Sequence, residues 1–197
     1  MKPHQIAVGV KPRDQAIEVL TLAFALDPVA RWFYPNEEYW RHFPIFVQAF
    51  AGRSFDHWTA CHASGSRGAA LWLPPHVHPD EHAVVKVIES TVARSRRGEV
   101  FDLMGELGEH HPHTPHWYLP VIGVHPDHYS RGIGTELLLQ GLERADTDAL
   151  PAYLEATTDK SRELYERLGF RATGTIKAGS SPPLYPMVRA PDPRAEP

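Results

Sequence analysis

The segment from Val124 to Thr135, which reads VHPDHYSRGIGT, carries the clearest chemical signal in the chain. It follows an apolar run and places Gly132 and Gly134 where a helical pattern begins. The first turn of a helix has unpaired N–H groups and the positive end of the helix dipole. Glycines at this point let a bulky anion reach the backbone, and Arg131 adds a cation beside it. The segment therefore predicts a site for a phosphate or a pyrophosphate.

Two common nucleotide-binding loops do not fit this segment. A Walker loop needs Gly-Lys-Ser/Thr, whereas Thr135 and Glu136 follow the second glycine here. A dinucleotide-binding fingerprint needs a third glycine at the position of Leu137. The glycine pair has one other explanation, which is that a tight turn from strand to helix needs it for packing.

The same segment resembles the cofactor motif of the GCN5-related N-acetyltransferases, the GNAT superfamily. In that family a strand ends in Val-x-Pro, and Gln/Arg-x-x-Gly-x-Gly/Ala opens the following helix. Val124–Pro126 and Arg131–Gly134 match, whereas Tyr129 replaces the usual Gln or Arg. Because that position contributes mainly its backbone N–H, we expect coenzyme A binding to be kept. The resemblance implies that the pyrophosphate is bound by Tyr129, Ser130, Arg131, Gly132, Ile133, Gly134 and Thr135.

A second motif follows in the order and separation that the family shows. Tyr153–Thr157 reads as a strand, and Tyr165–Phe170 matches the family pattern Tyr-x-x-x-Gly-Phe at the end of a helix. The clear resemblance extends from about Trp117 to Arg189. In chain length and in the residues of this second motif, the sequence is similar to the puromycin N-acetyltransferase-like branch.

The strand before the glycine loop is expected to hold the acetyl group and the pantetheine arm, through Ile122, Gly123 and Val124. In the family, a bulge in this strand frees a backbone N–H for the thioester carbonyl. Gly123 tolerates the dihedral angles of a bulge, and Pro120 has no N–H for a ladder bond. We therefore expect an irregular strand that splays from a neighbour. A twisted strand with a packing glycine is the alternative.

Transfer of acetyl to an amine needs an acid for the leaving thiolate and a base for the ammonium. The resemblance implies that Tyr165 is the acid, and a phenol with a pKa of about 10 stays protonated at pH 7. Glu155 is the predicted base, because partial burial raises the pKa of a carboxyl group. Ser161 lies one helical turn before Tyr165 and is expected to bond to coenzyme A. Structural roles for Tyr165 and Glu155 remain alternatives, and the other candidate bases are Glu109, His110, His116 and Tyr118.

No metal site is predicted. The histidines from His110 to His116 crowd a loop broken by prolines, whereas zinc ligands lie on rigid elements with Cys or carboxylate partners. A solvated or acceptor-facing loop is the interpretation. Cys61 is the single cysteine, so an internal disulfide is excluded and a buried thiol is expected.

Length and charge restrict the class of protein. The 197 residues fit one domain, expected over residues 1–190, with a Pro-rich tail at 191–197. A net charge of -4 with only short basic clusters argues against a nucleic-acid partner. No apolar run approaches a membrane span, and the N-terminus lacks a signal-peptide core. A cytoplasmic protein without a membrane partner is expected.

Hydrophobic periodicity and Gly/Pro positions predict the elements that must hold these residues. Strands are expected near residues 6–10, 57–62, 69–73, 116–124, 152–157, 171–176 and 184–189. Helices are expected near residues 14–26, 37–51, 80–96, 99–109, 130–145 and 159–168. The predicted fold is a single α/β domain of the α+β type. Its mixed, mostly antiparallel sheet has about six or seven strands, flanked by helices, with two central strands splayed in a V.

The resemblance implies an N-acetyltransferase that moves acetyl from acetyl-coenzyme A to a primary amine by direct attack in a ternary complex. A small-molecule acceptor is expected in a closed aromatic pocket, with Trp32, Phe33, Tyr34 or Trp117 in its wall. A protein or peptide N-acetyltransferase is one alternative, and a non-catalytic coenzyme A-binding regulatory module is the other. The sequence does not indicate the oligomeric state.

Overall fold

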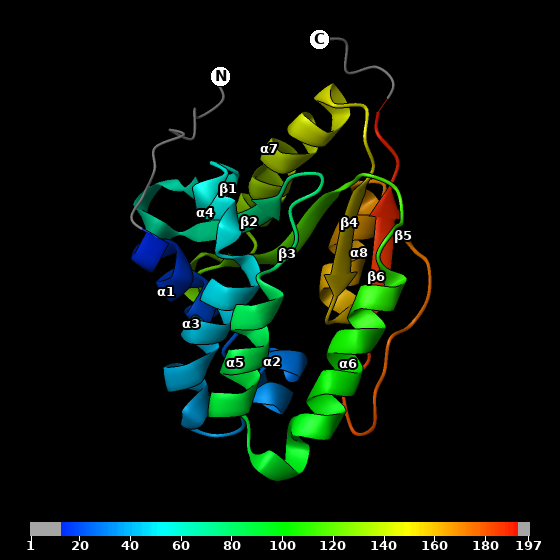
Figure 1. The fold of residues 1–197 in the computed structure, drawn as a ribbon. Coiled ribbons are helices and arrows are strands. Elements are labelled where there is room, and N and C mark those ends of the chain that lie inside the picture. Colours follow the sequence, from blue (N-terminus) through cyan, green and yellow to red (C-terminus); the bar gives the residue numbers. More distant parts are fainter. Residues whose placement is uncertain (1–12, 193–197) are drawn as a thin grey trace.

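A computed structural model describes residues 13–192. Within that range, six strands form one sheet in the order β1-β2-β3-β4-β6-β5, and the parallel pair β3–β4 is flanked by antiparallel pairs (Figure 1). The strands are β1 (Ala60–Ala63), β2 (Gly68–Leu73), β3 (Trp117–Val124), β4 (Ala152–Ala156), β5 (Arg171–Ala172) and β6 (Tyr185–Arg189). The helices are α1 (Arg13–Ala23), α2 (Pro28–Phe33), α3 (Glu38–Ala51), α4 (Arg53–Asp56), α5 (Glu81–Thr91), α6 (Arg97–His110), α7 (Ile133–Thr147) and α8 (Asp159–Arg167). The predicted single α/β domain with a mixed sheet is confirmed.

Two apolar clusters lie on opposite faces of the sheet, because successive side chains of a strand point to opposite sides. Every residue of β2 is buried. Ala69 and Leu71 belong to the cluster made with α1, α2, α3, α5 and α6. Ala70 and Trp72 belong to the cluster made with α7 and α8. The sheet is thus covered on both faces by helices.

α7 approaches the sheet closely through one stripe of small and apolar residues. Leu137, Leu138 and Leu142 are buried on this face. A Cβ atom at Gly141 would lie 2.0 Å from Cε2 of Trp72. Gly141 therefore permits the close contact between α7 and Trp72 of the sheet.

The two central strands separate as predicted. β3 and β4 pair only through Trp117–Ala152 and Tyr118–Tyr153, after which their registered contacts end. The pairing of β3 with β2 shifts between Leu71 and Leu73, whose partners are Val121 and Tyr118. One extra residue on β3 therefore lies beside Pro120, which cannot donate to a ladder.

The irregularity expected in this strand lies beside Pro120, and Gly123 fits the alternative of a packing glycine. Gly123 pairs regularly with Ala69, three residues beyond Pro120. A Cβ atom at Gly123 would lie 2.5 Å from Cβ of Ala23 in α1. Its glycine is needed because a helix packs directly on the strand at this point.

Several elements differ from their predicted bounds. The helix expected over 80–96 ends at Thr91, because Val92 takes an extended backbone with φ −89° and ψ 136°. The strand expected over 57–62 begins at Ala60, and the strand expected over 171–176 keeps only Arg171–Ala172. The strand expected at 6–10 and most of the tail after 190 lie outside the described residues. Between residues 13 and 192, no helix is long and apolar enough to cross a membrane.

Candidate functional site

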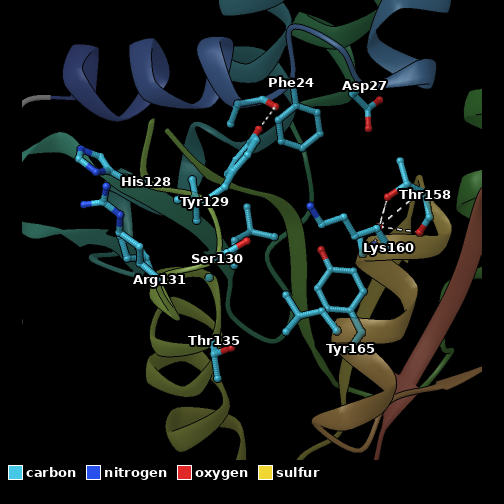
Figure 2. Close-up of a pocket in the computed structure, with 18 of the residues that line it drawn as sticks. Phe24, Asp27, His128, Tyr129, Ser130, Arg131, Thr135, Thr158, Lys160 and Tyr165 are labelled. Atoms are coloured by element: carbon cyan, nitrogen blue, oxygen red, sulfur yellow. Dashed lines mark hydrogen bonds between the residues drawn. The ribbon is translucent and has the colours of Figure 1, made fainter. Parts of the chain in front are cut away.

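A groove of about 640 Å³ opens between the start of α7 and the start of α8 (Figure 2). The end of β3 forms its floor, and the end of α1 closes one side. The groove collects every residue that the resemblance implies for the cofactor: Ile122, Gly123, Val124, Tyr129, Ser130, Arg131, Gly132, Ile133, Gly134, Thr135 and Ser161.

The start of α7 is open toward this groove. Its N-cap is Gly132, with φ 79°, and no side chain caps the helix. Ser130 is also left-handed, with φ 61°, so α7 begins at Ile133 and not at Ser130 as the sequence predicted. Backbone turns of this kind direct successive N–H groups into one concave face that suits an anion.

Internal packing does not explain why position 134 is a glycine. A Cβ atom there would lie 3.6 Å from Val124 and 3.8 Å from Leu164, which are ordinary contact distances. A Cβ atom at Gly132 would meet no atom within 4 Å, although its positive φ itself favours glycine. Gly134 thus leaves space on the groove side of the helix start, which supports the anion interpretation over the packing alternative.

Basic side chains reach the groove from both walls. Arg131 comes from the glycine loop, and Lys160 and Arg167 come from α8. The ammonium of Lys160 lies 5.6 Å from the ring centroid of Tyr129. The Tyr129 hydroxyl donates to the carbonyl of Ala23 at 3.3 Å, so this departure from the family pattern ties the loop to α1. The charges favour an anionic group beside the helix start.

Tyr165 lies at the inner end of the groove. Its side chain projects from α8, and Figure 2 shows its hydroxyl pointing into the groove. The residue is 7% exposed, and its ring packs 5.9 Å from that of Phe170. Burial raises the pKa of Tyr165, and the negative charge of Asp27 adds to this effect. The phenol is therefore protonated at neutral pH and can act as a proton donor.

Ser161 has a local role that the sequence prediction did not include. Its amide donates to Oγ1 of Thr158, and its Oγ accepts from the Thr158 amide at 3.3 Å. These contacts form the capping box of α8. Ser161 lines the groove, but its hydroxyl is already engaged in the helix start.

A second, apolar pocket of about 90 Å³ adjoins the groove where β3 and β4 separate. Both cavities share Phe24, Asp27 and Thr157 in their walls. The rest of the pocket is mainly aromatic and aliphatic, with Val29, Ala30, Phe33, Phe43, Phe46, Val47, Phe50, Leu103, Met104, Leu107, Pro120, Val121, Glu155 and Leu184.

Glu155 faces the apolar pocket and not the groove. Its side chain is 6% exposed, and Tyr118 donates to its Oε2 at 3.0 Å. Burial raises the pKa of Glu155 to about 7, although the Tyr118 hydrogen bond opposes the shift. A carboxyl group with this pKa is half ionised at neutral pH, which suits a general base.

Asp27, which follows the helix predicted over residues 14–26, is a site residue that the sequence did not single out. It is the N-cap of α2, where its Oδ1 accepts from the amides of Val29 and Ala30, both at 2.9 Å. Its Oδ2 accepts from the Thr157 hydroxyl. Burial raises the pKa of Asp27, against these hydrogen bonds. Because Asp27 lines both cavities, its carboxyl group lies at their junction.

The other aromatic and basic candidates have different positions. Phe33 lines the apolar pocket as predicted, but Trp32, Tyr34 and Trp117 do not line it. Their polar atoms bond instead to Ser180, Thr91 and Asp148, respectively. Among the candidate bases, Glu109, His110, His116 and Tyr118 line neither cavity.

Residues 34–170 match the sequence model of the Acetyltransferase (GNAT) family. Among solved structures, a histone acetyltransferase HPA2 and related acetyltransferase from Corynebacterium glutamicum is 26% identical. The TM-score is 0.63, and the alignment covers 91% of both chains.

Two less similar structures share the fold. Arylalkylamine N-acetyltransferase 2 from Aedes aegypti has 14% identity and a TM-score of 0.64, with 91% of this chain and 94% of that chain covered. A polyamine N-acetyltransferase from Drosophila melanogaster, which forms N-acetylagmatine, has 15% identity and a TM-score of 0.64, with 90% and 94% covered. Because the family match extends from the end of α2 to Phe170 just beyond α8, this protein belongs to the GNAT acetyltransferase family.

Proposed function

We propose that this protein transfers acetyl from acetyl-coenzyme A to the primary amine of a small molecule. One observation carries the proposal. A groove with an open helix start leads along β3 to a buried tyrosine, and a separate apolar pocket meets it there. The groove has a volume of about 640 Å³ and basic side chains that suit an anionic cofactor, and the pocket provides a place for a second substrate. Direct transfer in a ternary complex needs both.

The cofactor is placed by its pyrophosphate. In the proposed complex the amides at the start of α7 and the Arg131 side chain bind the pyrophosphate, and the pantetheine arm follows Ile122–Val124. The thioester then lies near Tyr165 and Asp27, where groove and pocket meet. β4 has parted from β3 at this point, which leaves β3 amides without a strand partner on that side. Such an amide can stabilise the oxyanion.

The acetyl transfer then needs two proton movements. The neutral amine nitrogen attacks the thioester carbon, and the C–S bond breaks as the tetrahedral intermediate collapses. The thiolate takes its proton from Tyr165, whose phenolate regains a proton from water when coenzyme A leaves. The amine gives its proton to Glu155, which faces the acceptor pocket and has a pKa of about 7. Each proton is thus handled by a group on the side of the junction where it is needed.

The pocket also indicates the class of acceptor. A cavity of about 90 Å³ with an aromatic wall suits an aryl or alkyl group. The Asp27 carboxylate at its entrance favours an approaching ammonium. Structural neighbours that act on agmatine and arylalkylamines support a small amine. A protein or peptide acceptor and a purely regulatory coenzyme A-binding role are the alternatives.

Arg131→Glu is expected to raise the Kd for acetyl-coenzyme A at least tenfold, equal to about 1.4 kcal/mol. The substitution places a negative charge beside the pyrophosphate site, at an exposed position where folding is little affected. Isothermal titration measures the affinity, and Arg171→Glu on exposed β5 is the matched control. Thiol release with an amine panel of 2-phenylethylamine, agmatine and spermidine then tests transfer. No binding at millimolar acetyl-coenzyme A would refute the proposed function, and binding without transfer to any amine would favour the regulatory role.

Asp27→Asn is expected to raise the KM for the amine about tenfold and to leave the affinity for acetyl-coenzyme A nearly unchanged. Asparagine caps a helix about as well as aspartate, so α2 keeps its start while the charge is lost. Asp80→Asn makes the same change at the N-cap of α5, which lines neither cavity, and is the control. An unchanged KM would show that Asp27 is only a helix cap.

A further inference from the structure

The turn between α6 and β3 brings a histidine to the inner side of Glu155. Nε2 of His111 lies 3.5 Å from Oε1 of Glu155. The two oxygens of Glu155 differ in their contacts. Oε2 accepts a hydrogen bond from the Tyr118 hydroxyl, whereas Oε1 is buried without a hydrogen-bond partner. The Glu155 side chain is 6% exposed, whereas that of His111 is 22% exposed. His111 therefore lies between the buried carboxyl group and solvent.

Hydrogen bonds continue from His111 toward the surface. Nδ1 of His111 lies 3.3 Å from Nε2 of His116. Nδ1 of His116 lies 2.8 Å from the carbonyl oxygen of Thr114, which is an exposed residue. The order of atoms is thus Glu155 Oε1, His111 Nε2, His111 Nδ1, His116 Nε2 and His116 Nδ1.

The Thr114 carbonyl sets the direction of this chain, because it can only accept. Nδ1 of His116 must therefore carry a proton, and Nε2 of a neutral His116 is an acceptor. Nδ1 of His111 must then donate to it, which leaves a lone pair on His111 Nε2. This lone pair faces Oε1 of Glu155. The arrangement accepts a proton from Glu155 and cannot donate one to it at rest.

Both rings are held in the neutral state that this assignment needs. Burial, together with the neighbouring His116 and His78, lowers the pKa of His111 to about 4. Burial also lowers the pKa of His116. The 3.5 Å separation fits an ionised Glu155, whose Oε1 faces a lone pair and has no proton to share. Once Glu155 is protonated, Oε1 can donate to His111.

We propose that His111 and His116 carry to solvent the proton that Glu155 receives from the acceptor amine. This inference rests on the proposed function. The proton on Glu155 Oε1 moves to His111 Nε2, and the His111 Nδ1 proton moves to His116 Nε2. His116 releases its Nδ1 proton to water, and both rings return to their starting tautomers by proton exchange with water before the next turnover. The net result is one proton moved from the amine to water and a Glu155 carboxylate ready for reuse.

The other routes from Glu155 are closed. In the proposed ternary complex, the acceptor occupies the apolar pocket and coenzyme A occupies the groove. Among the described residues, the titratable groups that face Glu155 are Tyr118 on β3, Tyr153 on β4 and His111, with His116 and His78 behind them. Burial raises the pKa of Tyr118 and of Tyr153, so neither phenol accepts a proton. His111 is the neutral base in this set that touches Glu155.

The tautomers provide a test that does not depend on the acceptor. Nitrogen-15 NMR of protein labelled at histidine, at pH 7.5, is expected to show His111 and His116 protonated at Nδ1 and not at Nε2. His111→Gln and His116→Gln variants assign the two signals. A His111 protonated at Nε2 would overturn the relay, because the lone pair would then point away from Glu155.

Kinetics with the amine that the wild-type enzyme accepts from the panel provide the second test. His111→Ala is expected to lower kcat at pH 7 by about 10- to 100-fold, with the Kd for acetyl-coenzyme A unchanged. Imidazole in the buffer is expected to restore much of the loss, because it can enter the vacated space and accept the proton. His116→Ala, at the outer end, is expected to show a smaller loss with the same rescue. His113→Ala on the same exposed turn is the control, and circular dichroism checks folding.

The outcomes separate the relay from the function on which it rests. If wild-type protein acetylates no amine, the proposed function fails. If wild-type protein is active and His111→Ala is equally fast, the relay fails alone. A folded His111→Ala variant that is slow and not rescued by imidazole also contradicts the relay, since a structural role explains that result.

Discussion

Glu155→Gln is expected to lower kcat for amine acetylation by about 100- to 1,000-fold, within the range that a general base contributes. Glutamine keeps the size of the side chain and can still accept from the Tyr118 hydroxyl at the position of Oε2. It cannot take a proton from the amine. The affinity for acetyl-coenzyme A is expected to stay unchanged, because Glu155 lines the acceptor pocket and not the groove.

The pH dependence distinguishes a base from a structural carboxyl group. Since Glu155 must be ionised to act, kcat of the wild-type enzyme is expected to rise with pH through about 7. This rise of kcat through pH 7 is expected to be absent in Glu155→Gln. Stopped-time assays of thiol release from pH 5.5 to 9 measure both profiles, and Glu163→Gln on α8, which lines neither cavity, is the control. If kcat of Glu155→Gln still rose with pH through about 7, the general base would be another group.

The stability that Glu155 contributes is expected to fall as pH rises, whereas kcat is expected to rise. Burial raises the pKa of Glu155 from 4.5 to about 7, so between these values the folded protein binds more protons than the unfolded chain. The contribution of this group to stability is therefore full below about pH 4.5 and is lost as pH rises through 7. At pH 8 the neutral glutamine is expected to make the protein at least as stable as wild type. Thermal unfolding at pH 8 thus separates a catalytic loss from a folding defect.

The groove could be predicted from sequence because its determinants are local. The strand, the glycine loop and the start of α7 are continuous from Ile122 to Thr135, and a left-handed Gly132 needs its residue type wherever it occurs. The splay of β3 from β4 was also predictable, since Pro120 removes a ladder donor within the strand. Sequence could not tell whether Gly123 serves a strand bulge or close packing. The contact that decides between them is with Ala23 of α1, which is distant in the sequence.

The acceptor side could not be predicted, because it is assembled from distant segments. Asp27 reads as a helix stop before Pro28, and only folding places it against Thr157 of the segment after β4. Glu155 was found because a carboxylate on an apolar strand is unusual. His111 gave no such signal, because it is one of several histidines in a turn, and its contact with Glu155 depends on how α6 ends beside the sheet.

Tyr165→Phe is expected to lower kcat about 100-fold while the Kd for acetyl-coenzyme A changes less than threefold. The hydroxyl supplies the proton that the leaving thiolate needs, and its raised pKa keeps it protonated throughout the working pH range. The phenyl ring of phenylalanine can keep the packing against Phe170, so folding should be nearly unaffected. Steady-state and single-turnover thiol release measure the effect on chemistry.

A matched substitution tests whether the lost hydroxyl acts through chemistry or through the core. Tyr185→Phe removes a phenol from the same apolar cluster at a position that lines neither cavity, and its kcat is expected to match that of wild type. An unchanged kcat in Tyr165→Phe would remove this residue from the mechanism. A parallel rise in Kd for acetyl-coenzyme A would instead assign the hydroxyl to cofactor binding. Loss of kcat alone requires a donor at the thiolate, because only the step that breaks the C–S bond would have slowed.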